Sequence, residues 1–147
     1  MKVAVVSDEL YPVNEFIIQQ VKGLGHEVIL FGALKSHEAE FWVDAAREAA
    51  QAITDGRCDE GIFFCWTGTG ITIAANKIDG IRASLCTDSQ TAAAARIWNG
   101  ANVLALSNRL LTQDLAAEIL NSWFNTAMNE ESRRAIAALQ MLEQERE

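Results

Sequence analysis

The segment Cys65-Trp66-Thr67-Gly68-Thr69-Gly70 combines residue types that can perform acid–base chemistry. It follows a short apolar run and leads into a helical pattern, and its glycines let the backbone turn tightly and approach a ligand. The N-terminus of a helix attracts an anion or a developing oxyanion, and it stabilises the thiolate form of a nearby cysteine. The segment therefore predicts a base or nucleophile beside an anion-binding backbone. The alternative is a tight turn next to a buried, structural cysteine.

Other common sites find little support in the sequence. It contains no GxxxxGK[ST] phosphate loop, and Gly68-Thr69-Gly70 lacks the continuation of a dinucleotide-binding GxGxxG motif. His26 and His37 are the only histidines and neither lies beside a cysteine, so a metal site is poorly supported. The 3 cysteines are odd in number and include no CxxC pair, which favours reduced thiols.

The composition is that of an acidic protein with enough apolar residues for one core. The chain has 147 residues, 50% of them apolar, and a net charge of −8. Nucleic-acid binders need basic patches, so nucleic acid is not an expected partner. No apolar run approaches the ~20 residues that span a bilayer, and the first residues favour a buried strand over a signal peptide. We expect a single domain over residues 1–147, no membrane partner and a cytoplasmic location.

Short apolar runs alternate with amphipathic stretches along the chain. This order predicts an α/β protein with a three-layer α/β/α, Rossmann-like architecture and a doubly wound, parallel, five-stranded sheet. Ligands of such sheets bind beyond the carboxyl ends of the strands, where the Cys65 segment lies. The expected strands are 3–7, 27–31, 61–65, 81–86 and 102–106, and the expected helices begin at Pro12, Glu38, Thr69, Asp88 or Ser89, Thr112 and Glu130.

The last expected helix, residues 130–147, has apolar positions spaced by three at Ile136, Leu139 and Leu142. The preceding helices already cover most of the expected strands, so few are left for this helix to pack on. Two arrangements stay open: the helix crosses to a partner subunit, or it packs on its own domain.

Residues 65–86, with the sequence C-W-T-G-T-G-I-T-I-A-A-N-K-I-D-G-I-R-A-S-L-C, resemble the ribose-5-phosphate isomerase B / galactose-6-phosphate isomerase family. That family typically shows C-G-T-G-x-G-x-S-I-A-A-N-K followed by G-I-R-A. Residues 99–106 are similar to its N-x-x-N-V-L-A segment, and the resemblance covers nearly the whole chain. It implies a Rossmann-like fold without cofactor or metal, and a homodimer or dimer of dimers with shared active sites. It also implies aldose–ketose isomerisation of a sugar or sugar phosphate through an enediol.

The resemblance also implies roles for individual residues. Cys65 is the implied base that moves a proton between C1 and C2 of the open-chain sugar, with the Thr67 hydroxyl assisting. The backbone amides of residues 67–70 are expected to hold the enediolate oxygen. The expected substrate-binding residues are Asp8, Glu9, Trp66, Gly68, Thr69, Gly70, Asn76, Trp98, Asn99, Arg109, Arg133 and Arg134.

Several positions depart from the family's pattern in one direction. Glu9 stands where the family often has a phosphate-binding histidine, Trp98 where it has a ring-opening histidine, and Phe41 where a tyrosine is usual. Trp66 replaces a glycine inside the loop itself. These changes remove cationic or proton-shuttling groups while leaving Cys65 in place. We therefore expect a substrate other than ribose 5-phosphate, such as a smaller, open-chain or non-phosphorylated sugar.

Two further interpretations stay open. The family's C-terminal Gly-Arg-His/Arg region, which clamps phosphate, is replaced here by N-E-E-S-R-R at residues 129–134. Loss of this clamp and of the ring-opening histidine also fits a sugar-binding or regulatory protein without catalysis. Alternatively phosphate binding is retained by Arg109, Arg133 or Arg134, since the guanidinium fork suits phosphate.

Overall fold

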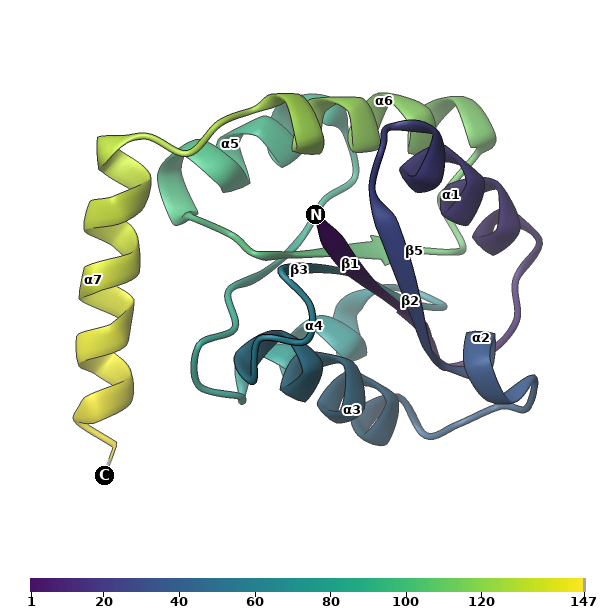
Figure 1. Ribbon diagram of the computed structural model, residues 1–147, viewed down its shortest axis with the longest axis horizontal. Coiled ribbons are helices and arrows are strands. Elements are labelled where there is room, and N and C mark those ends of the chain that lie inside the picture. Colours follow the sequence, from purple (N-terminus) through teal and green to yellow (C-terminus); the bar gives the residue numbers. More distant parts are fainter. Residues whose placement is uncertain (147) are drawn as a thin grey trace.

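A computed structural model describes residues 1–146 as a five-stranded parallel sheet between two layers of helices (Figure 1). The strand order is β2-β1-β3-β5-β4, as in a Rossmann-like fold, which confirms the expected fold class. The strands are β1 (Lys2–Ser7), β2 (Glu27–Gly32), β3 (Glu60–Cys65), β4 (Ala83–Leu85) and β5 (Val103–Ser107). The helices are α1 (Pro12–Gly23), α2 (Ala33–Ser36), α3 (Trp42–Thr54), α4 (Thr69–Asn76), α5 (Ser89–Asn99), α6 (Gln113–Asn125) and α7 (Glu130–Gln144).

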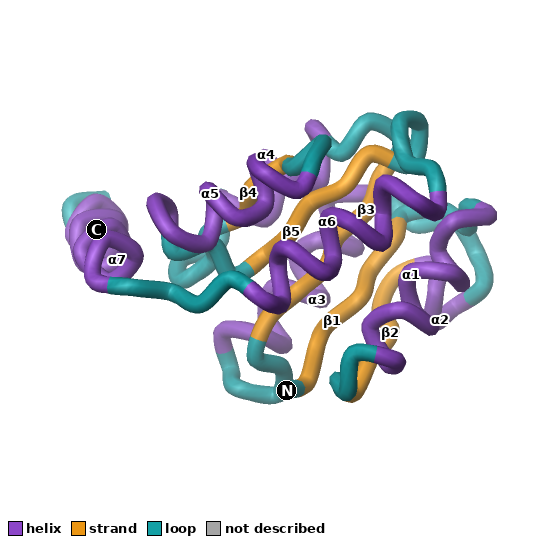
Figure 2. The backbone as a smooth tube through the Cα atoms, turned by 90° about the horizontal axis from the view of Figure 1, so that it is seen from above, coloured by secondary structure: helices purple, strands orange, loops and turns teal. Residues whose placement is uncertain are grey.

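Alternation along the central strands divides the core between the two faces of the sheet. Ile62 and Phe64 of β3 face α1, α5 and α6, whereas Phe63 and Cys65 face α3 and α4. Because successive side chains of a strand point to opposite faces, strands that are apolar at every position can be buried on both sides. The tube in Figure 2 follows these strands through the middle of the molecule, between the helices.

Three expected helix starts are confirmed by their capping groups. Pro12 is the first residue of α1, where its missing N–H costs nothing. Asp88 accepts from the Thr91 N–H at 2.7 Å and caps α5, and Thr112 accepts from the Leu115 N–H at 3.1 Å and caps α6. A side-chain acceptor at this position satisfies one of the N–H groups that a helix start leaves without a partner.

Two boundaries differ from the expectation. The helix expected from Glu38 begins at Trp42, because the preceding segment crosses to the end of β1, where the Glu40 N–H donates to the Asp8 carbonyl at 2.8 Å. β4 is shorter than expected and begins at Ala83, because the Arg82 N–H donates to the Asn102 side chain rather than to a strand.

α7 lies beside the β4 edge of the sheet, next to α5 (Figures 1 and 2). The Ser132 hydroxyl donates to the carbonyls of Arg96 and Ile97 at 2.8 Å, which ties the start of α7 to the end of α5. Leu142 on the same helix is 57% exposed. The helix ends at Gln144 rather than at 147, which lies outside the described residues. No helix within residues 1–146 is both long and apolar enough to cross a membrane.

The ends of the parallel strands form two opposite sides of the sheet, which we call the carboxyl edge and the amino edge. The carboxyl edge is where β1, β3 and β5 end, at Ser7, Cys65 and Ser107. The amino edge is where these strands begin, and α5 returns there and ends at Asn99. Five residues of β3 from Gly61 to Cys65 separate the edges by roughly 13 Å.

Candidate active site

Cys65 ends β3 at the carboxyl edge, directly beside Ser107 of β5. Its side chain is nearly buried, and the Gly68 N–H donates to Sγ at 3.2 Å. The thiol reaches a hollow of about 330 Å³, which we call the Cys65 hollow. The residues that line it are Asp8, Trp42, Cys65, Trp66, Thr67, Thr69 and Gly70.

Gly68 makes the turn from β3 into α4 possible. Its φ is +78°, in the left-handed region that side-chain-bearing residues rarely adopt. A Cβ at this position would lie 2.5 Å from Cδ1 of Leu85 and 3.0 Å from the backbone of Leu106. The turn must stay this close to β5 for the Gly68 N–H to reach the thiol, so both conformation and space require glycine.

The carbonyls of the Cys65 loop are held by residues that follow β5. The Asn108 N–H donates to the Cys65 carbonyl at 3.1 Å, and the Arg109 N–H donates to the Trp66 carbonyl at 2.9 Å. The Asn108 amide also donates to the Cys65 carbonyl at 3.3 Å, and it accepts from the buried Asn14 amide at 3.3 Å. This network connects α1, β3 and the end of β5, so the backbone that carries the thiol is rigid.

The start of α4 presents polar groups to the Cys65 hollow. Thr69 and Gly70 are the first residues of the helix, so their N–H groups have no acceptor within it. The hydroxyls of Thr67 and Thr69 lie 2.8 Å apart and form a hydrogen bond in which either can be the donor. Backbone N–H groups and hydroxyls in this position can hold an oxygen on which negative charge develops.

Asp8 brings a carboxylate from the end of β1 to the same hollow. Burial raises the pKa of Asp8, and the neighbouring charge of Glu9 raises it further. The Tyr11 hydroxyl donates to Asp8 Oδ1 at 3.3 Å. Burial, followed by the charges of Asp8 and Glu9, raises the pKa of Tyr11, so its hydroxyl stays protonated and remains a donor.

Other predicted site residues lie at or toward the amino edge. Asn99 and Asn76 line a second hollow of about 510 Å³ between α7 and β4, which we call the α7 hollow. Asn76 uses its amide on the backbone of Ala83, donating to the carbonyl at 2.9 Å and accepting from the N–H at 2.8 Å. Trp98 is 60% exposed at the end of α5. Within a single chain, Trp98 and Asn99 therefore lie away from the Cys65 hollow, and their roles in substrate binding stay predictions.

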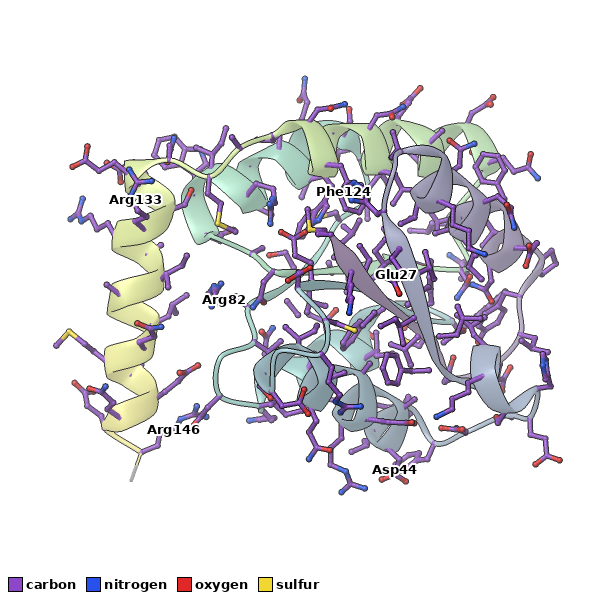
Figure 3. All side chains as sticks on the ribbon, viewed as in Figure 1. Glu27, Asp44, Arg82, Phe124, Arg133 and Arg146 are labelled. Carbon is purple, nitrogen blue, oxygen red and sulfur yellow. The ribbon has the colours of Figure 1, made fainter. Side chains whose placement is uncertain are left out.

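The predicted arginines are also divided between the two edges. Arg109 follows β5 at the carboxyl edge, and its side chain is exposed. Arg133 and Arg134 lie in the first turns of α7, beside the end of α5, and Figure 3 shows Arg133 at the upper, N-terminal end of this helix. Arg134 pairs with Glu131 at 3.8 Å. The structure therefore places only Arg109 near the loop that carries Cys65.

A buried ion pair anchors the end of α5 at the amino edge. Arg96 Nη1 lies 2.8 Å from Glu60 Oε1, and it also donates to the Ala101 carbonyl at 2.8 Å. The Trp123 indole N–H donates to Glu60 Oε2 at 3.0 Å, while the Arg96 guanidinium lies 4.8 Å from the Trp123 ring. The pair fixes the helix end that carries the neighbouring Trp98 and Asn99.

Sequence reasoning did not single out Tyr11 and Asn14, two residues that help to build the site. The Tyr11 ring stacks on Trp66 at the hollow, and the Asn14 amide donates to the side-chain oxygen of Asn108, whose own amide donates to the Cys65 carbonyl. Asn108 lies just beyond a carboxyl end of a strand, where ligands of such sheets bind, and this position was a usable signal. Tyr11 precedes Pro12 and looks like an ordinary helix-start residue, because its partners are distant in the sequence.

Comparison with known proteins places the chain in a family. The family model described as Ribose/Galactose Isomerase matches residues 3–141. The chain is 43% identical to D-erythrulose-4-phosphate isomerase of Pectobacterium atrosepticum over 88 residues, a match that spans 60% of this chain and 58% of that protein. It is 36% identical to ribose-5-phosphate isomerase B of Escherichia coli over 88% of this chain and 87% of that protein. The structure of ribose-5-phosphate isomerase B from Clostridium thermocellum superposes over 100% of both chains with a TM-score of 0.90 and 36% identity. The chain therefore belongs to the ribose/galactose isomerase family of aldose–ketose isomerases.

Proposed function

We propose that Cys65 is the base of an aldose–ketose isomerisation in the Cys65 hollow. The observation that carries this proposal is the position of the Cys65 thiol. The Gly68 N–H donates to it, and it lies in the lining of the Cys65 hollow together with the first residues of α4. The thiolate takes the proton from the carbon beside the substrate carbonyl and returns it to the former carbonyl carbon. A second proton passes from the hydroxyl that becomes the new carbonyl to the former carbonyl oxygen. One carbon is oxidised as the other is reduced, so no external oxidant or reductant is needed.

The start of α4 stabilises the intermediate of this reaction. Loss of the carbon-bound proton leaves an enediolate with negative charge on oxygen. The N–H groups of Thr69 and Gly70 and the hydroxyl of Thr67 are the donors available for that oxygen. Donors that are already in place need no reorganisation when the charge appears, which lowers the barrier.

The other two cysteines do not compete for the role of base. Burial raises the pKa of Cys58, and it raises the pKa of Cys86 to about 12. Neither residue lines the Cys65 hollow. Both thiols stay protonated near neutral pH, so they serve as small apolar groups of the core.

The substrate is an open-chain sugar, and we place a four-carbon sugar phosphate first. Trp98 stands where the family's ring-opening histidine is expected, and indole does not exchange protons as imidazole does. A four-carbon aldose with phosphate on its C4 oxygen cannot close a five-membered ring, so it needs no ring-opening group. The Pectobacterium relative is named for a four-carbon ketose phosphate, D-erythrulose 4-phosphate.

A second copy of the chain completes the site in this proposal. Trp98 and Asn99 lie at the amino edge, and the partner's copies of these residues would close the Cys65 hollow from outside. The exposed apolar side chains of α7, Met141 and Leu142, support association through the β4 edge. The protein is therefore proposed to act as a homodimer, or as a dimer of such dimers.

The test is turnover by the purified protein on a panel of free and phosphorylated aldoses and ketoses of four to six carbons. We expect isomerisation of a four-carbon sugar phosphate, and a loss of roughly 10²–10⁴-fold in kcat for Cys65→Ala. Cys58→Ala is the matched control, since it removes a buried thiol away from the hollow, and it should keep kcat. Turnover that survives Cys65→Ala would contradict the assignment of the base. Binding of sugars without turnover of any of them would favour the regulatory alternative.

A further inference from the structure

Tyr11 is the single tyrosine of the chain, and it lies against the Cys65 loop. Its ring stacks on the Trp66 indole, with the centroids 5.9 Å apart and the planes inclined by 29°. We propose that Tyr11 and Trp66 form a fixed aromatic wall that limits the Cys65 hollow to short sugar chains, so that Tyr11 is a specificity-determining residue. This inference rests on the proposed function and adds how the substrate's length is selected.

Tyr11 is held at both ends, which makes it a rigid support. Its backbone N–H donates to Asn14 Oδ1 at 2.8 Å, and Asn14 itself is buried and bonded to Asn108. At the other end, the hydroxyl donates to Asp8, a residue that lines the Cys65 hollow. The phenol ring therefore cannot turn without breaking a contact inside the site.

Trp66 needs this support because its side chain is otherwise free to move. Its carbonyl is fixed by the Arg109 N–H at 2.9 Å and the Ser107 hydroxyl at 3.1 Å. The indole, however, is 54% exposed and projects from a short loop. Offset stacking of two aromatic rings at this separation is favourable, so Tyr11 holds the indole in one position at the hollow.

An aromatic wall in this position selects substrates by the length of their carbon chain. Trp66 directly follows Cys65, and the Trp42 indole, against which the backbone of Gly70 packs, lines the same hollow. The reacting carbons must sit at the thiol, so an additional CHOH group has to extend toward an indole or leave the hollow. A difference of one carbon group in a shaped pocket changes specificity by roughly 10–200-fold.

The experiment measures binding of two stable acids by calorimetry, 4-phospho-D-erythronate and 5-phospho-D-ribonate, whose carboxylates mimic the enediolate. We expect wild type to prefer the four-carbon acid by at least about 10-fold, and Trp66→Gly to bring the two affinities within a few-fold of each other. Tyr11→Ala should shift the ratio in the same direction because the indole loses its support. Tyr11→Phe keeps the ring and should keep most of the preference, and Leu24→Ala, at the opposite end of the same helix, should keep all of it.

The outcomes separate this inference from the proposed function. Wild type that selects the short acid but shows no turnover on the sugar panel would overturn the isomerase proposal and support the wall. Cys65-dependent turnover together with an unchanged ratio in folded Trp66→Gly and Tyr11→Ala would overturn the wall alone. Wild type that binds neither acid would overturn the wall as well, because the hollow then accepts no sugar acid. Thermal unfolding of each variant establishes that it is folded.

Discussion

The two edges of the sheet use their polar groups in opposite ways. At the carboxyl edge, Cys65 and the start of α4 direct a thiol, hydroxyls and helix N–H groups into a hollow. At the amino edge, Glu60 and Arg96 form an ion pair inside the protein. The first arrangement leaves donors available for a ligand, and the second fixes a helix end whose Trp98 side chain is exposed. One edge therefore leaves polar groups available in a hollow, whereas the other uses them to hold a helix end in place.

The largest expected effect concerns sharing of the site between subunits. Cys65→Ala and Asn99→Ala should each be nearly inactive, because each removes one half of every site. Mixed by joint refolding, half of the dimers contain one copy of each variant, and one of their two sites is intact. The mixture should therefore recover about a quarter of wild-type turnover.

A second mixture serves as the control for this prediction. Cys65→Ala and Thr67→Ala alter the same loop of one chain, so every site in their mixed dimer carries one of the two changes. This mixture should stay inactive. If the Cys65→Ala and Asn99→Ala mixture is equally inactive although dimers form, the two edges do not meet in a shared site.

Removal of Arg96 tests the structural role of the amino edge. Arg96→Met leaves the Glu60 carboxylate buried without its partner, which should lower the free energy of unfolding by about 3–5 kcal/mol in urea titrations. Adding Glu60→Gln to this variant removes the unpaired charge and should restore part of the loss. Arg47→Met is the control, because its pair with Asp44 is exposed, and it should change stability by less than about 1 kcal/mol. Equal effects of Arg96→Met and Arg47→Met would contradict the anchoring role.

Substitution of Gly68 tests how much stability depends on the close packing of the turn between β3 and α4. Gly68→Ala should cost about 3 kcal/mol of stability, since it combines a left-handed φ with a Cβ pressed against β5. Gly23→Ala is the control, because its Cβ would meet no atom within 4 Å at the end of α1. That change should be neutral or stabilising by up to about 1 kcal/mol. A Gly68→Ala variant as stable as wild type would show that the turn can relax.

The fold was predictable because each local pattern agrees with the global one. Continuous apolar runs marked the five strands, and Pro12, Asp88 and Thr112 marked helix starts through their own chemistry. The late start of α3 was not predictable, since it depends on the bond from Glu40 to Asp8, which joins segments far apart in the sequence. The shortening of β4 likewise depends on the Asn102 side chain.

The candidate site was predictable where its residues are consecutive, and Asp8 was predicted from the family resemblance. Residues 65–70 show their chemistry as a single segment, whereas Tyr11 joins it through stacking on Trp66 across the fold. Asn76 looks like a sugar-binding amide in the sequence, but the structure uses both of its polar atoms on Ala83. The assignment of Asn99 to the same site depends on a second molecule, which a pattern within one chain cannot locate.

The smallest expected effect is a pH dependence at the carboxyl edge. The pKa of Asp8 in the folded protein is raised above its ordinary value of 3.8, so the fold favours the protonated carboxyl and is weakened by the carboxylate. This penalty is absent below pH 3.8 and develops as the pH rises through the higher, folded-state pKa. Asp8→Asn should therefore raise Tm slightly at neutral pH, and the gain should disappear in acid. The amide oxygen of asparagine can still accept from Tyr11.

Asp88 provides the control of opposite sign for this titration. The Thr91 backbone N–H and then the Thr91 hydroxyl donate to its carboxylate and lower the pKa of Asp88, so its contribution to stability is present above its ordinary pKa and lost as the pH falls. Asp88→Asn should consequently lower Tm slightly at neutral pH, with the difference shrinking in acid. Tm measured between neutral pH and acid for both variants decides the matter. If the change in Tm caused by Asp8→Asn has the same sign and the same pH dependence as that caused by Asp88→Asn, the ionised Asp8 carboxylate does not destabilise the fold.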